Sequence, residues 1–449
     1  MSTANRRSRG CPAPRSPARP CSSRGFALVI TLLLLALLLL AVLALSALTR
    51  ISTEISAASL RQTQARQNAL LGLEIALGEL QKHTGPDDRV TAMAGVTGLA
   101  ANAGNTTRHW CGVWDGGGNF VTWLASGAGE TPSASIQGAL TQVSLVDRGT
   151  VGAAAANSEP VAVGKLELRT IDPVTGQARA EGTYAYWVGD EGVKVSAFSP
   201  GAKLAMAGVS PVLASNPSTS ATAKLRAALA TYASKLPRVL SYEQLRLLPT
   251  PATSALTPSI LQDSFHHTTL SAWCLLPASS GIEQRSGTFN LNTNSVIAWR
   301  GILETYNVSA VLNSLSLLPA SVMGTSATTS APGKLATNLP SAAAAGKSVN
   351  GPFTTVAGFA GSGLLVAALA GSGVTPSQFI TGIGPLLTTR SDTFRLRAYG
   401  EALNPADATQ VEARAYCEAL VQRTSEAASG GAGHRYATVY FRWLGPDDI

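Results

Sequence analysis

Charged side chains are scarce in this 449-residue chain, since Asp, Glu, Lys and Arg make up only 13% and aromatic residues 6%. The motifs of a P-loop, a dinucleotide-binding turn, a G-x-S-x-G nucleophile and an H-E-x-x-H zinc site are all missing. The sequence therefore favours none of these enzyme classes. Its 45% hydrophobic residues and 43 glycines are typical of an exported, loop-rich protein with hydrophobic cores.

Acidic residues are missing from the first 25 positions, which contain Arg6, Arg7, Arg9, Arg15, Arg19 and Arg24. Removing those six charges from the formal net charge of +8 leaves +2 for the rest of the chain. A basic balance that resides in a short leader does not support a nucleic-acid partner. We therefore predict no nucleic-acid binding.

Cysteine is also rare, with five residues in all. Cys11 and Cys21 lie in the basic leader, which leaves Cys111, Cys274 and Cys417. These three are too widely spaced for a zinc or redox motif. One disulfide with an odd thiol and three small buried hydrophobic side chains are both compatible with this pattern.

The longest uncharged run extends from Phe26 to Leu48, 23 residues without Gly or Pro. A helix of about 20 apolar residues crosses a bilayer, whereas a removable signal peptide has an apolar region of only about 7–15 residues. All nearby positive charge precedes the run. The sequence thus predicts a single-pass inner-membrane anchor with a cytoplasmic N-terminus and a periplasmic body.

The helix is predicted to continue beyond the membrane. No Gly or Pro occurs between Phe26 and Leu71, and Gly85-Pro86 then ends the pattern. Small or apolar residues recur at helical spacing at Ile51, Ile55, Ala58, Ala65, Ala69, Leu73, Ala76 and Leu80. We therefore predict a helix over residues 26–83, roughly 85 Å long, whose outer part needs a protein surface to cover this stripe.

The junction Arg24-Gly25-Phe26, directly before the apolar run, resembles a type IV prepilin signature. The resemblance implies cleavage between Gly25 and Phe26 by prepilin peptidase and methylation of the new Phe26 amine. It also implies that residues 26–48 act first as a membrane anchor in lipid. They would later form the core of a filament with other pilin or pseudopilin subunits, in the periplasm or at the cell surface.

Ile30 departs from the common pilin pattern. Most such subunits carry Glu at the fifth mature position, where its carboxylate meets the N-terminal amine of a neighbour, and Ile offers no such partner. Minor pseudopilins of the K type in type II secretion also lack this Glu. The resemblance therefore favours a minor or tip role.

Blocks of the body resemble the same proteins. The segment "GTFNLNTNSVIAWRGIL" (287–303) matches the K-type N-x-N-T motif at Asn290, Asn292 and Thr293, and "RSDTFRLRAYGEALN" (390–404) resembles their late S-x-x-F-R-x-R-A strand. Further blocks resemble large pilin-like proteins called Verru_Chthon cassette protein A: "YAYWVGDEGVKVS" (184–196), "VEARAYCEALVQRT" (411–424) and "VYFRWLGPDDI" (439–449).

The predicted fold class is α+β: a long transmembrane-plus-amphipathic helix followed by a pilin-like antiparallel β-sheet body with a helical insert. Period-2 alternation predicts half-buried strands in 394–399 and 411–418, with their charged residues on exposed faces. Further strands are predicted in 165–172 and 184–190, around a turn, and in 437–444. The expected organisation is a cleaved leader (1–25), the helix (26–83), a first α/β part (84–204), a helical insert (205–320), a low-complexity loop (321–352) and a β-rich C-terminal part (353–449).

Few residues suggest bound ligands. Asp190 and Glu191 are predicted to lie in a turn as solvated acids. K-type pseudopilins bind calcium, so the resemblance makes calcium the one candidate cofactor for these two carboxylates. His266-His267 is predicted to be a surface pair rather than a metal site. The aromatic block His109–Trp123 is predicted to form a strand-loop-strand core rather than a ligand shelf.

The sequence is compatible with three functions. The first is a non-enzymatic, pilin-like structural subunit of a type IV pilus or type II secretion-like filament. The second is a signal-anchored envelope adhesin or carbohydrate-binding protein, compatible with the Ser/Thr-rich stretches. The third is an anchored hydrolase, which the lack of a nucleophile–base constellation disfavours.

Overall fold

The structure is a computed structural model. It describes residues 24–98, 105–138, 140–153, 157, 159–171, 176–197, 225, 241–242, 244, 257–270, 289–312, 314–324, 326–343, 351–431 and 433–449. The chain forms two compact units, Met1–Leu60 and Arg61–Ile449. Cys274 and most of the first part of the predicted helical insert, residues 205–256, lie outside the described residues; of that part only Leu225, Ser241, Tyr242 and Gln244 are described.

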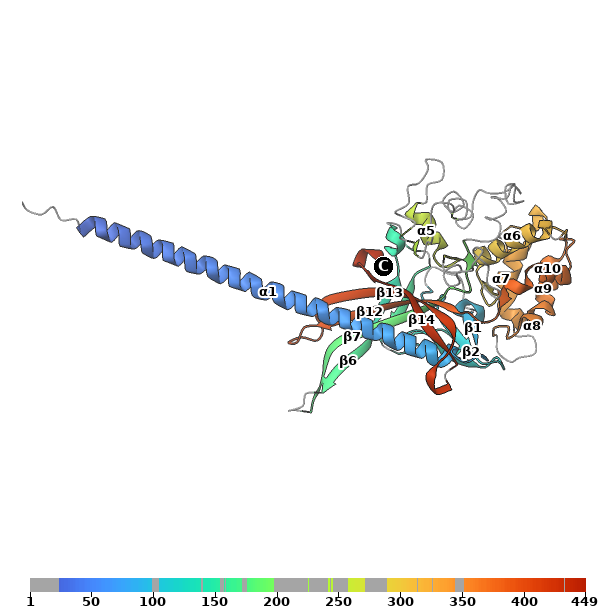
Figure 1. Cartoon of the computed structure of the whole chain (residues 1–449), viewed down its shortest axis with the longest axis horizontal. Helices are drawn as coiled ribbons and strands as arrows, with labels where there is room; N and C mark the ends of the chain where they lie inside the picture. Colours follow the sequence, from blue (N-terminus) through green and yellow to red (C-terminus); the bar gives the residue numbers. More distant parts are fainter. Residues whose placement is uncertain are drawn as a thin grey trace, which may run out of the picture. The chain divides into compact units, whose positions relative to one another are not determined.

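The first unit contains the beginning of helix α1 (Arg24–Thr84), drawn in blue in Figure 1. Every described side chain from Phe26 to Leu60 is exposed within this unit. The apolar window of α1 has a mean hydropathy of 3.3, so the helix is long and apolar enough to cross a membrane. Between Phe26 and Leu71 the sequence is rich in helix-forming Leu and Ala and has no Gly or Pro, which explains why the helix continues beyond the apolar run.

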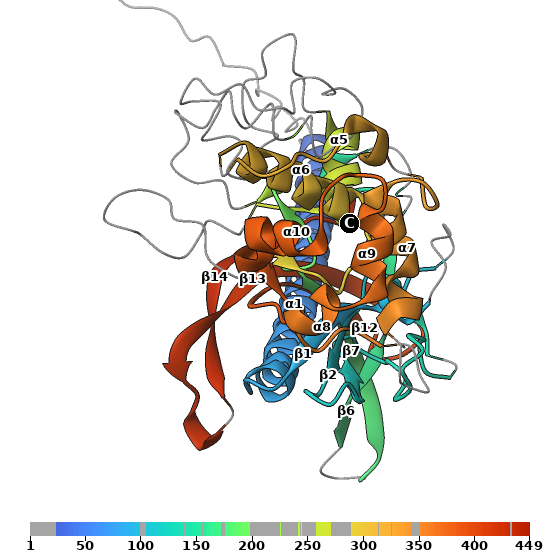
Figure 2. The same cartoon turned by 90° about the vertical axis from the view of Figure 1, so that its right-hand side faces the viewer.

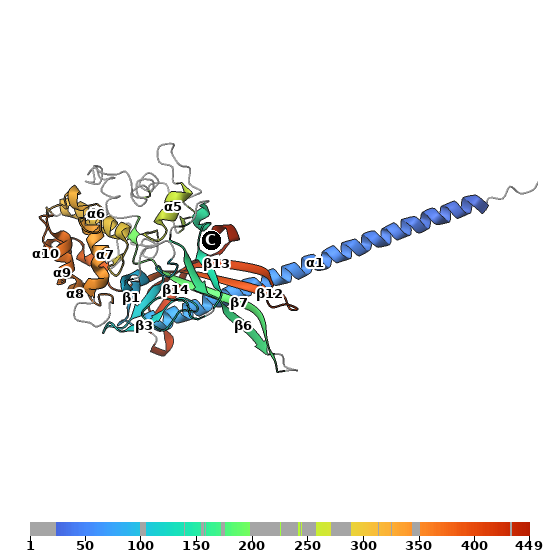
Figure 3. The same ribbon diagram turned by 180° about the vertical axis from the view of Figure 1, so that it is seen from behind.

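The second unit begins with the remainder of α1, which packs on a five-stranded antiparallel sheet. The strand order is β14-β13-β12-β7-β6. The bounds are β6 Leu166–Ile171, β7 Ala178–Asp190, β12 Thr393–Leu403, β13 Val411–Ala427 and β14 His434–Leu444. Figure 3 shows β6, β7, β12 and β13 from behind. The predicted strands are therefore confirmed, and β7 pairs with β12 although more than 200 residues separate them.

One face of this sheet is apolar and carries α1. Alternate residues of β12, from Phe394 through Leu396 to Ala398, form a core with the corresponding small residues of β13. The α1 side of this core consists of Ala65, Ala69, Leu73, Ala76 and Leu80. These five positions confirm the outer half of the predicted stripe. Its inner members Ile51, Ile55 and Ala58 belong to the exposed part of the helix.

Shorter strands complete the sheet structure of the body. Strands β1 (Val90–Met93), β2 (Cys111–Trp114) and β3 (Phe120–Trp123) form an antiparallel sheet in the order β1-β2-β3. Strands β4 (Gln142–Val146) and β5 (Val161–Gly164) pair with each other. Two parallel pairs are minimal: β8 (Val195–Ser196) with β9 (Thr268–Thr269), and β10 (Phe289–Asn290) with β11 (Leu387–Thr388).

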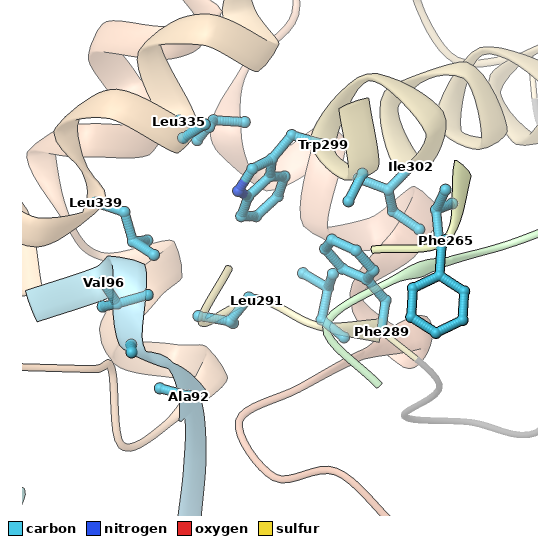
Figure 4. Close-up of a cluster of buried hydrophobic side chains, with 14 of the residues drawn as sticks. Ala92, Val96, Phe265, Phe289, Leu291, Trp299, Ile302, Leu335 and Leu339 are labelled. Atoms are coloured by element: carbon cyan, nitrogen blue, oxygen red, sulfur yellow. The ribbon is translucent and has the colours of Figure 1, made fainter. Parts of the chain in front are cut away.

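A group of helices forms the other part of the body (Figure 2). These are α6 (Val296–Leu312), α7 (Ala331–Ala343), α8 (Val356–Ala360), α9 (Gly363–Leu369) and α10 (Pro376–Ile383), while α5 (Pro258–Ser264) stands apart from them in sequence. Figure 4 shows their shared core, in which Trp299 of α6 lies near Leu335 and Leu339 of α7. Capping side chains fix several helix starts, and Thr375 and Gln378 form a capping box at α10.

The helices correct two expected boundaries. Residues 331–343 form α7, so the loop prediction for 321–352 is wrong for this segment. This Ala-rich segment has an apolar face, in which Leu335, Ala336 and Leu339 are buried. The β-rich C-terminal part also begins later than residue 353, because α8, α9 and α10 precede β11.

Candidate functional site

The predicted processing junction lies at the beginning of α1. Gly25 belongs to the first turn of the helix, and the side chains of Phe26 and Ile30 are exposed. Because nothing in the first unit covers the apolar surface from Phe26 to Leu60, this surface needs lipid or other protein around it. The exposed Ile51, Ile55 and Leu60 lie beyond the 23-residue apolar run, so lipid alone does not cover all of it.

The C-terminal half of α1 packs closely against the main sheet. A Cβ atom added to Gly400 would overlap the backbone of Ala65, Asn68 and Ala69. The Asn68 side-chain amide donates to the carbonyl of Glu401 at 2.7 Å, and Gln62 donates to the carbonyl of Arg414 at 3.2 Å. Small residues on both surfaces thus allow backbone-to-backbone packing, which holds this half of α1 to β12 and β13.

The two blocks that resemble K-type pseudopilins meet in the folded body. The Asn290 amide donates to Ser391 Oγ at 3.0 Å and to the Thr91 carbonyl at 2.9 Å. Asn292 donates to the carbonyl of Phe353 at 3.0 Å and accepts from its backbone N–H at 2.9 Å. These buried amides therefore join β1, β10 and the chain before α8 and β12, which is a structural role.

The second face of the main sheet carries a buried ion network. Glu418 accepts from Arg397 Nε at 2.7 Å and from Arg395 at 2.8 Å, and all three side chains are at most 1% exposed. Arg442 and Tyr440 also bond to this carboxylate. Burial would raise the pKa of Glu418, but the charges of Arg395, Arg397 and Arg442 outweigh burial and hold that pKa well below its usual range.

This network corrects the predicted exposed face of the β12–β13 hairpin. The cross-strand charge pairs exist, with Arg397 directly opposite Glu418, but they are covered rather than solvated. Phe265, which follows α5, lies over the guanidinium groups of Arg395 and Arg397 at 5.3 and 4.9 Å. Arg397 also donates to the Leu145 carbonyl of β4 at 2.8 Å.

Asp190 and Glu191 are buried as well, so the prediction of solvated acids is wrong. Glu191 accepts from Lys194 Nζ at 2.6 Å and Arg395 Nε at 2.9 Å, while Thr269 donates to its other oxygen at 2.7 Å. Burial opposes ionisation of Glu191, yet the charges of Arg395 and Lys194 lower its pKa to about 2. Because cations already occupy this carboxylate, the pair does not fit a calcium site, which needs six to eight oxygen ligands.

The histidine pair is also buried, which contradicts the predicted surface location. His267 Nε2 lies 3.0 Å from Glu159 Oε2, and His109 Nε2 lies 3.2 Å from the same oxygen. Arg108 donates to the other oxygen of Glu159 at 2.7 Å. The ring of His266 stacks on His109 with centroids 3.8 Å apart. Sequence reasoning missed Glu159, since nothing in its local pattern marks it.

A chain of contacts runs from Ser295 through His267 to Glu159, with 2.8 Å between Ser295 Oγ and His267 Nδ1. These residue types in this order can activate a serine nucleophile. Ser295, however, is only 2% exposed, and its Oγ accepts from the Ala298 N–H at the start of α6 at 3.0 Å. The arrangement therefore caps a helix and offers no access to a substrate.

Both described cysteines and all described tryptophans except Trp443 lie in the core. Cys111 and Cys417 are both free and buried, and burial raises the pKa of Cys417 to about 12. For Cys111 and Cys417, this agrees with the alternative in which the cysteines serve as small buried hydrophobic side chains rather than as disulfide partners. Trp110, Trp114 and Trp123 are also buried, so the strand-loop-strand prediction is confirmed. No group of three or more His, Cys, Asp or Glu within the described part of the chain is arranged to hold a metal ion.

Comparisons with known proteins add little. No family model and no curated protein matches this chain. A solved structure with some similarity is the GspK-GspI-GspJ complex from the type 2 secretion system of enterotoxigenic Escherichia coli. The match has a TM-score of 0.29 and 13% sequence identity, and it covers 62% of this chain and 84% of that one. A superposition of this quality assigns neither a function nor a partner.

Proposed function

We propose that this protein is a pilin-like structural subunit, matured by prepilin peptidase between Gly25 and Phe26, of a type IV pilus or type II secretion-like filament. The observation that carries the proposal is the division of α1. Its first part is apolar and its side chains are exposed. Its second part packs on an antiparallel sheet through Ala65, Ala69 and Ala76. Such a helix is built for side-by-side packing with helices of other subunits.

The exposed surface of α1 also supports an order in which the chain is first anchored in the membrane and is then assembled into a filament. Residues 26–48 match the thickness of a bilayer, so the unassembled chain is held in the inner membrane with its body in the periplasm. Ile51, Ile55 and Leu60 stay exposed beyond that length and would be covered by neighbouring pilin or pseudopilin helices on assembly. The body serves as a structural module rather than as an enzyme.

Ile30 supports a minor or tip position. In most of the pilins that this chain resembles, a carboxylate at this place pairs with the ammonium of the next chain, and Ile would leave that charge unpaired in an apolar surrounding. A subunit at the end of a filament has one neighbouring layer fewer, so this cost need not recur along the filament. Immunogold labelling of sheared filaments should then place the protein at filament ends rather than along their length.

The decisive experiment is the mass and N-terminal sequence of the protein extracted from membranes. We expect a mature chain that begins with methylated Phe26. The variant Gly25→Val should keep its leader, because a branched side chain blocks the peptidase. The matched variant Gly10→Val changes a leader glycine away from the junction and should be processed normally.

An intact leader in wild-type cells with an active prepilin peptidase would overturn the proposal and leave a signal-anchored envelope protein. A cut after Leu48 would make the body a secreted protein instead. Uniform labelling along filaments would retain the pilin function but contradict the tip position.

A further inference from the structure

A small cavity lies inside the body where strand β7 ends. Its wall includes His109, from the chain before β2, Asp190, from the end of β7, and His266, which follows α5. These three side chains are 5%, 5% and 3% exposed. Met93 and Trp187 contribute apolar surface to the wall. Lys194 also lines the cavity, and its Nζ donates to Glu191 at 2.6 Å.

These three residues bring four buried polar atoms that have no hydrogen-bond partner among the described residues. They are Asp190 Oδ2, both ring nitrogens of His109, and His266 Nε2. His109 Nε2 has the Glu159 carboxylate 3.2 Å away, which leaves the other three without a nearby partner. The other oxygen of Asp190 accepts from the backbone N–H of Gly192 at 2.8 Å, and the hydroxyls of Ser391 and Thr91 also donate to this carboxylate. Buried polar atoms almost always have a partner, and three on one cavity wall point to a ligand there.

The hydrogen-bonding capacity of each atom follows from its surroundings. His109 Nε2 faces the Glu159 carboxylate at 3.2 Å, so in the neutral ring it carries the proton and leaves Nδ1 as an acceptor. Asp190 Oδ2 is also an acceptor. His266 Nε2 can supply the complementary N–H. A small ligand that donates two hydrogen bonds and accepts one would therefore satisfy all three atoms.

The cavity has a volume of about 10 Å³, which suffices for the centre of one water molecule. We propose that it binds a single ordered water that donates to Asp190 Oδ2 and His109 Nδ1 and accepts from His266 Nε2. The water links the main sheet, the strand β2 region and the segment after α5. This internal site is independent of the filament function proposed above.

A metal ion would fit the same residue types but not their geometry. The rings of His109 and His266 are stacked with centroids 3.8 Å apart and an interplanar angle of 10°. Because a nitrogen lone pair lies in the plane of its ring, two nearly parallel rings cannot both direct lone pairs at one ion about 2 Å away. Hydrogen bonds to water are longer and tolerate more deviation from the ring plane.

The test is a crystal structure of the full-length protein in detergent, at a resolution that shows ordered waters. Diffraction data are also collected above the zinc absorption edge. We expect one peak that refines as a water oxygen within about 2.7–3.2 Å of all three atoms, with no anomalous signal. An anomalous peak would replace the water with a metal, and a cavity without density would overturn the proposal.

The variant His266→Phe provides a matched second measurement, since it keeps the stacked ring but removes both ring nitrogens. The density at the site should lose occupancy or disappear in this variant. Full occupancy would contradict the role of His266 as the third partner. If the variant does not fold, the wild-type density alone decides the question.

Discussion

At the scale of single residues, the buried carboxylate of Glu418 explains why the second sheet face tolerates arginine. Glu418→Gln leaves Arg395 and Arg397 in the interior without their charge partner, and breaking a buried pair in this way costs about 3–5 kcal/mol. We expect urea unfolding to show a loss of this size in the free energy of unfolding.

Glu412→Gln on the same strand β13 is the matched control. Glu412 pairs with Arg61 at 2.8 Å, but both side chains are partly exposed, so the loss should be at most about 1 kcal/mol. Equal effects of the two substitutions would show that burial does not distinguish these pairs.

The stacked histidines make stability depend on pH. Burial lowers the pKa of His109 and lowers that of His266 well below 6.5, so the unfolded chain binds more protons at these sites than the folded chain. Stability is therefore complete above pH 6.5 and falls as the pH drops below it. Asp190 opposes this trend, because burial raises its pKa to about 6 and its protonation favours folding between pH 6 and 4.

Because the pKa of His266 lies well below 6.5 and that of His109 is lowered as well, we expect the unfolding midpoint to drop between pH 7 and 5. His266→Phe removes one of the two and should flatten this part of the profile, measured by thermal unfolding in steps of half a pH unit. An unchanged slope would mean that His266 does not control it. Glu159, Arg108 and Lys194 also surround the cluster; the pKa of Glu159 lies well below its usual range, so Glu159 stays charged throughout.

At the scale of elements, the fit of α1 on β12 depends on missing side chains. Gly400→Ala forces a methyl group against the backbone of Ala65 and Ala69, and the overpacking should cost about 1–3 kcal/mol. Gly78→Ala, on an exposed position of the same helix with nothing within 4 Å of the added Cβ, should stabilise by about 0.5–1 kcal/mol. Chemical denaturation of both variants checks the opposite signs.

At the scale of the whole molecule, the division of the chain predicts what the body needs to fold. Residues 61–449 form a unit with its own cores, and no described side chain between Phe26 and Leu60 is buried. A chain that begins at Arg61 should therefore unfold at the same temperature as the full-length protein in detergent.

A chain that begins at Gly85 is the contrasting truncation. It lacks Ala65, Ala69, Leu73, Ala76 and Leu80, and the apolar sheet face of Phe394 and Leu396 would be open to water. We expect this chain to aggregate or to lose cooperative unfolding. Normal unfolding of this shorter chain would show that α1 is dispensable for the body.

Much of this protein is determined by local sequence pattern. The unbroken apolar run from Phe26, the small-residue stripe of Ala65 to Leu80 and the alternation in β12 and β13 each predict their element, because backbone geometry repeats at fixed periods. The prepilin-like junction is likewise a local motif that can be seen in the sequence alone.

Only the tertiary structure decided which polar residues are buried. Alternation shows that Arg395, Arg397 and Glu418 share a face, but covering that face depends on Phe265 and Leu145, which are distant in sequence. The same holds for Glu191 and for His266, whose partners come from other elements. A charge looks identical in sequence whether water or a distant partner satisfies it, and desolvation is set by the elements that pack over it.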